Sequence, residues 1–236
     1  MPFSLGIWDR LPVQTQKKIL RISHPAWFGT LHRTSPVSNR WGFDRGTPID
    51  RYYIYNFLTQ HRSHIRGNVL EVGRLDYTVR LGSDVERCEV LDNNPSNSKV
   101  TLIADLEKPL EIPSNKYDCL IFTQVLQFIF NLKPCLEELH RILRPGGVLL
   151  ATLPCVSRID TSYGTEKDLW RFTGSACQRL FDSVFGEENV LIEFYGNVLS
   201  CVAFLEGIAY EELSRRELDK KDPLYPLIIG VKTVKI

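Results

Sequence analysis

Short apolar runs alternate with helical patterns through most of this 236-residue chain, and this alternation constrains the fold more than any other feature. The expected strands are rich in Val, Ile and Leu and cover residues 68–72, 89–92, 100–104, 118–123, 148–153, 190–195 and 227–233. Short apolar strands separated by helices are typical of a mainly parallel sheet covered on both faces. The sequence therefore predicts an α/β fold with a doubly wound, mainly parallel sheet of seven strands.

The expected helices have recognisable starts and apolar faces. Residues 132–143 repeat leucine at helical spacing. Thr47 is expected to cap a helix that begins with Pro48, and Thr173 to cap another that runs to residue 185. A long amphipathic helix is predicted over residues 198–218, with an apolar face that packs on the domain or on a second subunit of a homodimer.

The N-terminal part of the chain lacks the regular alternation. A short helix is expected at residues 12–22, and a stretch rich in Pro, Ser, Thr and His follows it. We interpret residues 1–45 as an irregular, partly helical extension or lid, and residues 46–236 as the main domain.

Composition argues against several classes of partner. Twenty-nine basic residues nearly balance 28 acidic ones, so no net field attracts a nucleic-acid backbone. No apolar run approaches the ~20 residues needed to cross a bilayer, and the N-terminus lacks the pattern of a signal peptide. The six cysteines lack the Cys-x-x-Cys spacing of a metal site or redox pair. We expect a cytoplasmic protein without a metal, a membrane segment or a nucleic-acid partner.

Acidic residues and a glycine stand where the expected strands end. After the first strand, Gly73 lets a ligand approach the backbone, and the carboxylate of Glu71 can hold loop amides or an ammonium group. Asp92 ends the second strand, where an acid can accept hydrogen bonds from both hydroxyls of a ribose. Asp105 and Leu106 follow the third strand and suit the amine and the ring of an adenine. Because ligands bind beyond the carboxyl ends of parallel strands, this pattern predicts a cofactor site there.

The order of these motifs resembles that of the class I methyltransferases that use S-adenosylmethionine (SAM), in particular those with a methyltransferase type 11 domain. The similarity covers roughly residues 66–155 and includes Val-Leu-Glu-Val-Gly, Val-Leu-Asp, Ala-Asp-Leu and Leu-Arg-Pro-Gly-Gly-Val-Leu-Leu. It implies a Rossmann-like fold and SAM as the cofactor. The cofactor-binding residues that it implies, with their neighbours, are Glu71, Gly73, Arg74, Asp92, Asn93, Asp105, Leu106, Thr123 and Gln124.

The chain departs from this family pattern at two places. Leu75 and Tyr77 replace the second and third glycines of the usual Glu-x-Gly-x-Gly-x-Gly loop, and we expect them to crowd the cofactor or widen the loop. The Glu-His pair often seen after the fourth strand is Gln127-Phe128 here, so no acid–base role follows from that pair.

Segments beside the cofactor motifs supply the other candidates. Residues 41–53 and 170–173 resemble parts of methyltransferases from glycan and secondary-metabolite biosynthesis. The substrate-binding candidates are Arg45, Arg51, Tyr52, Trp170 and Arg171. The candidates for a catalytic base are Asp50, Asp160, Asp168 and a histidine of the N-terminal arm, either His24 or His32, and the sequence does not choose between them. Asp50 fits equally well as a helix-cap acid, and Trp170 as a core anchor.

These expectations predict an enzyme that methylates an oxygen of a sugar or another small polar metabolite, with the sugar implied by the resemblance alone. A nicotinamide-dependent oxidoreductase is disfavoured, because no Gly-x-Gly-x-x-Gly follows the first strand. A degenerate methyltransferase fold that only binds its ligand stays an alternative, because Leu75 and Tyr77 interrupt the first loop.

Overall fold

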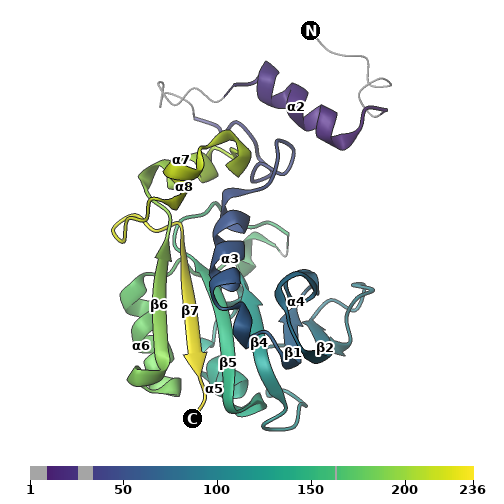
Figure 1. The fold of residues 1–236 in the computed structure, drawn as a ribbon, viewed down its shortest axis with the longest axis vertical. Coiled ribbons are helices and arrows are strands. Elements are labelled where there is room, and N and C mark those ends of the chain that lie inside the picture. The colour runs from purple at the N-terminus through teal and green to yellow at the C-terminus, as the bar shows by residue number, and fades with distance from the viewer. Residues whose placement is uncertain (1–9, 26–33, 163) are drawn as a thin grey trace.

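In the computed structural model, which describes residues 10–25, 34–162 and 164–236, seven strands form one sheet in the order β3-β2-β1-β4-β5-β7-β6 (Figure 1). The strands are β1 (Gly67–Val72), β2 (Val85–Asp92), β3 (Leu102–Ile103), β4 (Tyr117–Thr123), β5 (Leu143–Pro154), β6 (Val190–Tyr195) and β7 (Ile228–Val234). β1 to β5 pair in parallel, and β7 runs antiparallel to both of its neighbours. The predicted α/β fold with a mainly parallel, seven-stranded sheet is confirmed.

Helices cover both faces of this sheet. The α-helices are α2 (Val13–Ser23), α3 (Ile49–Gln60), α4 (Asp76–Leu81), α5 (Leu132–Ile142), α6 (Gly174–Phe185), α7 (Val198–Leu205) and α8 (Arg215–Asp219). Successive strand residues alternate between two cores, because side chains of a strand point to opposite faces. Leu70 and Leu120 pack with α5 and α6, whereas Val69 and Ile121 pack with α3 and α7.

The prediction of one long helix over residues 198–218 is wrong. This segment forms α7, a short 3₁₀ turn at Tyr210–Glu212 (η5) and α8. Gly207 adopts a φ of 69°, and the N–H of Ile208 donates to the carbonyl oxygen of Ala203, which is the hydrogen bond that ends helices in a Schellman motif. The turn directs Ile208 into the core of the same chain.

One of the two predicted helix caps is confirmed. The Thr173 side chain accepts a hydrogen bond from the N–H of Ala176 at the start of α6. The prediction for Thr47 is wrong, because its hydroxyl donates to Glu211 and the residue before α3 is Pro48. Glu211 lies on η5, so this hydrogen bond joins the start of α3 to the C-terminal helical segment.

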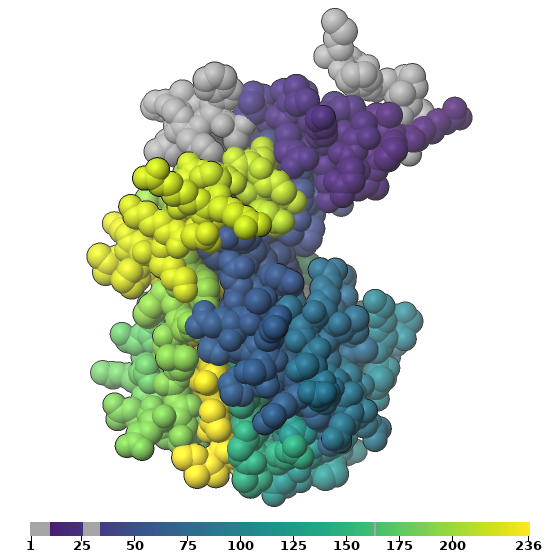
Figure 2. Space-filling view, viewed as in Figure 1, coloured from purple at the N-terminus to yellow at the C-terminus, as the bar shows by residue number. Residues whose placement is uncertain are grey.

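The segment before α3 packs against the C-terminal helices at the end of the molecule where the parallel strands finish. The predicted N-terminal helix is confirmed as α2, which Figures 1 and 2 show at the same end of the molecule as α7 and α8. Lys17 of α2 donates to the carbonyl oxygen of Gly46, and Arg45 forms an ion pair with Glu212. Residues 1–9 and 26–33 of the predicted extension lie outside the described parts of the chain. None of the described helices is long and apolar enough to cross a membrane.

Candidate functional site

A cavity of about 820 Å³ opens at the carboxyl ends of β1, β4 and β5. Gly73, Gln124 and Val156 follow these three strands directly or closely, and all of them line the cavity. α3 and α4 contribute further side chains, and so does the connection between β5 and α6, residues 155–173, which we call the β5–α6 segment. The site therefore lies where an open parallel sheet presents its strand ends to a ligand.

The cavity brings together many of the residues that the sequence singled out, and leaves others out. The predicted residues that line it are Asp50, Arg51, Tyr52, Glu71, Gly73, Arg74, Thr123, Gln124, Asp160, Asp168 and Arg171. The predicted residues outside its lining are Arg45, Asp92, Asn93, Asp105, Leu106 and Trp170. His24 lies outside it too, and His32 lies outside the described residues.

Glu71 holds the turn between β1 and α4. Its carboxylate is only 2% exposed and accepts hydrogen bonds from the N–H of Tyr77 (3.1 Å), the N–H of Thr78 (2.8 Å) and the hydroxyl of Thr78 (2.6 Å). Burial raises the pKa of Glu71, and the bonds from Thr78 and Tyr77 oppose that rise. Of the two roles suggested by the sequence, the structure has Glu71 binding the amides that begin α4.

The turn that follows Glu71 is short and open. Gly73 has a φ of 77°, and no atom lies within 4 Å of the place where a Cβ would stand. α4 begins at Asp76, so Tyr77 belongs to the helix and not to the loop, and Leu75 alone replaces a loop glycine. Space for a ligand exists beside Gly73, and of the two residues expected to crowd it, Tyr77 lines the cavity and Leu75 does not.

Asp92 and Asp105 occupy turns at the ends of β2 and β3. Asp92 accepts hydrogen bonds from the N–H of Asn94 (3.0 Å) and from the side chain of Asn97 (2.8 Å), which also donates to the carbonyl oxygen of Gly73. Asn97 thus connects the ends of β1 and β2. Asp105 accepts a hydrogen bond from Glu107 N–H, which lowers its pKa, and pairs with the exposed Lys108.

Asp50 is a buried carboxylate at the start of α3. It is 9% exposed, and its Oδ1 has no hydrogen-bond partner in the part of the chain that the structure describes. Its Oδ2 lies 3.8 Å from Nε of Arg51. Burial raises the pKa of Asp50, and the charge of Arg51 opposes the rise only partly. An acid in this condition can accept a proton or a hydrogen bond from a ligand.

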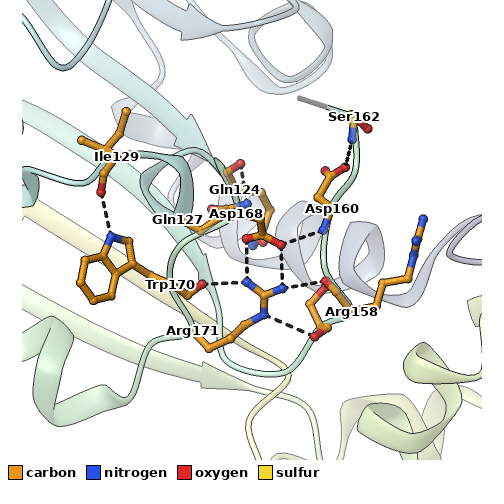
Figure 3. Close-up of polar contacts among 10 residues, drawn as sticks. Gln124, Gln127, Ile129, Arg158, Asp160, Ser162, Asp168, Trp170 and Arg171 are labelled. Carbon is orange, nitrogen blue, oxygen red and sulfur yellow. Dashed lines mark hydrogen bonds and ion pairs between the residues drawn. The ribbon is translucent and has the colours of Figure 1, made fainter. Parts of the chain in front are cut away.

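Asp168 and Arg171 form the centre of a hydrogen-bond network in the β5–α6 segment (Figure 3). The Arg171 guanidinium donates to both Asp168 oxygens at 2.7 and 2.8 Å and to carbonyl oxygens of Ser157 and Arg158. Asp168 also accepts the N–H of Asp160 at 2.7 Å. Burial alone would raise the pKa of Asp168, but the bonds from Arg171 and Asp160 outweigh it and lower that pKa. Asp168 is therefore a structural anion that holds the segment.

Gln127 is a lining residue that the sequence reasoning set aside when it found no Glu-His pair. It lies on the 3₁₀ turn η2 (Leu126–Phe128) that follows β4, and it is 6% exposed. Its Nε2 donates to the carbonyl oxygen of Gln124 at 2.9 Å, while Oε1 lacks a partner among the described residues. A glutamine in place of the glutamate of the expected Glu-His pair was the available signal.

Besides Arg51 and Arg171, the three other substrate candidates also have structural partners. Arg45 is buried, and its guanidinium binds Glu212 and the carbonyl oxygen of His24. Trp170 donates to the carbonyl oxygen of Ile129 at 2.9 Å and stacks on Phe130. The Tyr52 hydroxyl donates to Asp219 of α8 at 2.5 Å, while the residue still lines the cavity.

The described residues contain no group of three or more His, Cys, Asp or Glu side chains that could hold a metal ion. Carboxylates, amides, guanidinium groups, hydroxyl groups and aromatic rings line the cavity.

Comparison with known families identifies one domain type. The model of the methyltransferase domain called Methyltransf_11 matches residues 77–151. Among curated proteins, probable polyketide synthase 38 of Dictyostelium discoideum is 32% identical over 90 residues, which are 36% of this chain and 3% of that protein. Probable polyketide synthase 39 of the same organism is 31% identical over 90 residues, with the same coverage. The chain thus matches a small part of these much longer relatives.

Comparison with solved structures shows the same fold. A SAM-dependent methyltransferase from Archaeoglobus fulgidus has a TM-score of 0.54 at 14% identity and covers 78% of this chain and 94% of that one. One from Mesorhizobium loti has a TM-score of 0.51 at 15% identity and covers 79% and 98%. The cyclase SpnF has a TM-score of 0.53 at 15% identity and covers 94% of each chain. At these identities the likeness shows the fold, and the fold alone does not choose the reaction.

Proposed function

We propose that this chain, which carries a class I SAM-dependent methyltransferase domain, transfers the methyl group of SAM to a hydroxyl oxygen of a small polar acceptor, and that this acceptor is a sugar. The observation that carries the proposal is Asp50, a buried carboxylate with an unpartnered oxygen in a cavity at the ends of the parallel strands. A methyl transfer to oxygen releases one proton, and such a carboxylate can accept it.

The residues at the strand ends fit SAM. Gly73 leaves open space beside the backbone, and Glu71 fixes the turn that contains it. Each oxygen of Asp92 accepts one hydrogen bond, and a carboxylate oxygen can accept two, so Asp92 retains capacity for the ribose hydroxyls. Bound SAM supplies an electrophilic methyl group, and the protein supplies alignment, a base and the exclusion of water.

The cavity lining supports a hydroxylated acceptor. The aromatic side chains of Phe43 and Tyr55 line the cavity and can pack on a sugar ring, and Asp50 and Gln127 offer oxygens to its hydroxyl groups. The resemblance of residues 41–53 to methyltransferases of glycan biosynthesis adds to this. The matched segments of the polyketide synthases are too small a part of those proteins to indicate an acceptor.

Asp50 is the best of the three carboxylate candidates for the base. Both oxygens of Asp168 bind Arg171, and its lowered pKa makes it a poor proton acceptor. Asp160 accepts the N–H of Ser162 and lies on the β5–α6 segment that Asp168 holds. Asp50 alone of the three combines burial, a raised pKa and an unpartnered oxygen in the described structure.

We expect Asp50→Asn to lower kcat by about 100-fold, the magnitude typical of a lost general base. The affinity for SAM should stay within about twofold, because the amide keeps the shape of the carboxylate. Since only the deprotonated acid accepts a proton, the rate of the native enzyme should rise as the pH rises through the elevated pKa of Asp50, and the variant should lack this rise. Steady-state kinetics across pH and calorimetric SAM binding test these expectations.

The control is Asp182→Asn on α6, where Asp182 pairs with Gln178 outside the cavity lining, and we expect native kinetics. A lower SAM affinity in Asp50→Asn, with kcat unchanged at saturating SAM, would assign Asp50 to the ammonium group of the cofactor. A loss of kcat in Asp160→Asn and not in Asp50→Asn would transfer the role of base to Asp160.

A homodimer stays a prediction from the sequence. Of the apolar residues in 198–218 that suggested it, Ile208 is buried in the chain's own core, and Val198 and Leu205 are exposed.

A further inference from the structure

Gln127 is held in one orientation by its surroundings. Its Nε2 donates to the carbonyl oxygen of Gln124, and its own backbone carbonyl accepts the N–H of Leu169 at 2.9 Å. Gln124 is fixed in turn, because it donates to Thr152 through both its N–H and its side chain. A carbonyl oxygen only accepts hydrogen bonds, so the amide nitrogen of Gln127 must face Gln124, and Oε1 is left as the free acceptor.

The unpartnered Oε1 is unusual for a group buried this deeply. Native proteins pair the great majority of buried polar atoms, and exceptions commonly mark places where something else supplies the partner. In the described parts of the chain, five buried side-chain atoms lack a hydrogen-bond partner. Only Oε1 of Gln127 and Oδ1 of Asp50 belong to residues that line the cavity. Both are oxygens that accept hydrogen bonds, so a ligand that satisfies them must carry donors.

The position of Gln127 favours the acceptor over the cofactor as the source of the donor. Glu71, Gly73 and Asp92 lie at the ends of β1 and β2. Gln127 lies beyond the cofactor candidates Thr123 and Gln124 at the end of β4, and its backbone is bonded to Leu169 of the β5–α6 segment, next to the Asp168–Arg171 pair (Figure 3).

We propose that Gln127 determines acceptor specificity by accepting, at Oε1, a hydrogen bond from a hydroxyl or amino group of the acceptor other than the hydroxyl that is methylated. The inference rests on the proposed function, in which Asp50 takes the proton of the methylated hydroxyl. Together the two side chains select a compound that carries at least two hydrogen-bond donors, which is the chemistry of a polyol or an amino sugar. A mono-alcohol or an ether that presents one donor or none leaves Gln127 unpaired.

The test compares native protein with Gln127→Leu, which keeps the bulk of the side chain and removes the acceptor. Gln178→Leu is the matched control, because Gln178 lies on α6 and pairs with Asp182 outside the cavity lining. Gln127→Met is made in parallel, so that a folding defect of the leucine variant does not decide the result. The probes are common hexoses and hexosamines, each with its monodeoxy analogues, added to protein saturated with SAM.

We expect the native protein to methylate at least one member of the panel and to lose about tenfold or more in kcat/KM when one particular hydroxyl or amino group is removed. Gln127→Leu or Gln127→Met should raise KM for the intact sugar by a similar factor, lose the discrimination against that analogue and bind SAM with native affinity. Gln178→Leu should behave as the native protein does.

An unchanged KM in both Gln127 variants would overturn the specificity role while methyl transfer stands. A weakened SAM affinity with native acceptor discrimination would overturn it too, because Gln127 would then bind the cofactor. If SAM binds but no panel member is methylated, the proposed sugar methylation fails. Equilibrium binding of the same panel to protein saturated with S-adenosylhomocysteine then tests the role of Gln127 independently of methyl transfer. Binding at least tenfold weaker in the Gln127 variants supports the role, and equal or undetectable binding overturns it.

Discussion

Replacing Arg171 with alanine is expected to lower the free energy of unfolding by about 1.5–3 kcal/mol, the range for hydrogen bonds to a charged group, because the ion pair with Asp168 is partly buried. Asp168 would keep its charge in a place where its side chain is only 2% exposed. The guanidinium also holds the carbonyl oxygens of Ser157 and Arg158, so the β5–α6 segment would lose its main internal connections. Urea unfolding of the native chain and the variant gives the difference.

The same ion pair predicts how stability depends on pH. The pKa of Asp168 in the folded chain lies below its ordinary value, so its contribution is complete above the ordinary pKa of an aspartate and is lost as the pH falls toward the folded pKa. Arg171→Ala should lack this part of the acid destabilisation. Arg171→Lys keeps the charge without the bidentate geometry, so its acid destabilisation should be intermediate between those of the native chain and Arg171→Ala.

Arg179→Ala on α6 is the control, because Arg179 is exposed and lies outside the cavity lining. Its effect should stay within about 0.5 kcal/mol, as is usual for surface substitutions. A difference below about 1 kcal/mol for Arg171→Ala would contradict the claim that this network holds the segment, since exposed pairs contribute no more than that.

Replacing Glu71 with alanine is expected to lower the free energy of unfolding by about 2–4 kcal/mol, because it leaves the buried amide of Thr78 without an acceptor and removes two further hydrogen bonds. The turn at Gly73 would lose its anchor, so we also expect the affinity for SAM to fall by about tenfold or more. Thermal unfolding and calorimetric SAM binding measure the two effects.

Glu86→Ala is the matched control, since Glu86 is exposed on β2 and lies outside the cavity lining. It should leave both quantities close to native. If Glu71→Ala is destabilised and still binds SAM with native affinity, Glu71 supports α4 without shaping the cofactor site.

The sequence predicted those parts of the fold that local pattern determines. The strand at residues 190–195 was expected at the bounds that the structure has, because turn-forming and helical residues flank an apolar run. β2 begins four residues before its expected start, since Glu86 and Arg87 are exposed and hide the apolar pattern of a strand. Apolar spacing alone predicted the single helix over 198–218, whereas Gly207, which ends α7 in a Schellman motif, was the local signal against it.

In the candidate site, too, local sequence pattern predicted some features, and others depend on how the chain packs. The order of strand-end motifs identified Glu71, Gly73 and Gln124, which line the cavity, because strand ends converge in any sheet of this type. The partners that decide each residue's chemistry come from distant parts of the chain and leave no local pattern. The state of Asp50, with one oxygen unpaired, is visible only after the chain has packed around it.

Ligand-induced change in thermal stability tests the central claim most directly, because a ligand that binds the native state raises the melting temperature. SAM and S-adenosylhomocysteine should raise the melting temperature of the native chain, and NAD⁺ and NADP⁺ should leave it unchanged. Asp92→Ala should lose most of the shift with SAM, since a ribose contact would be gone. Stabilisation by a nicotinamide cofactor, or by none of these ligands, would contradict the account, and an equal SAM shift in Asp92→Ala would contradict the ribose assignment.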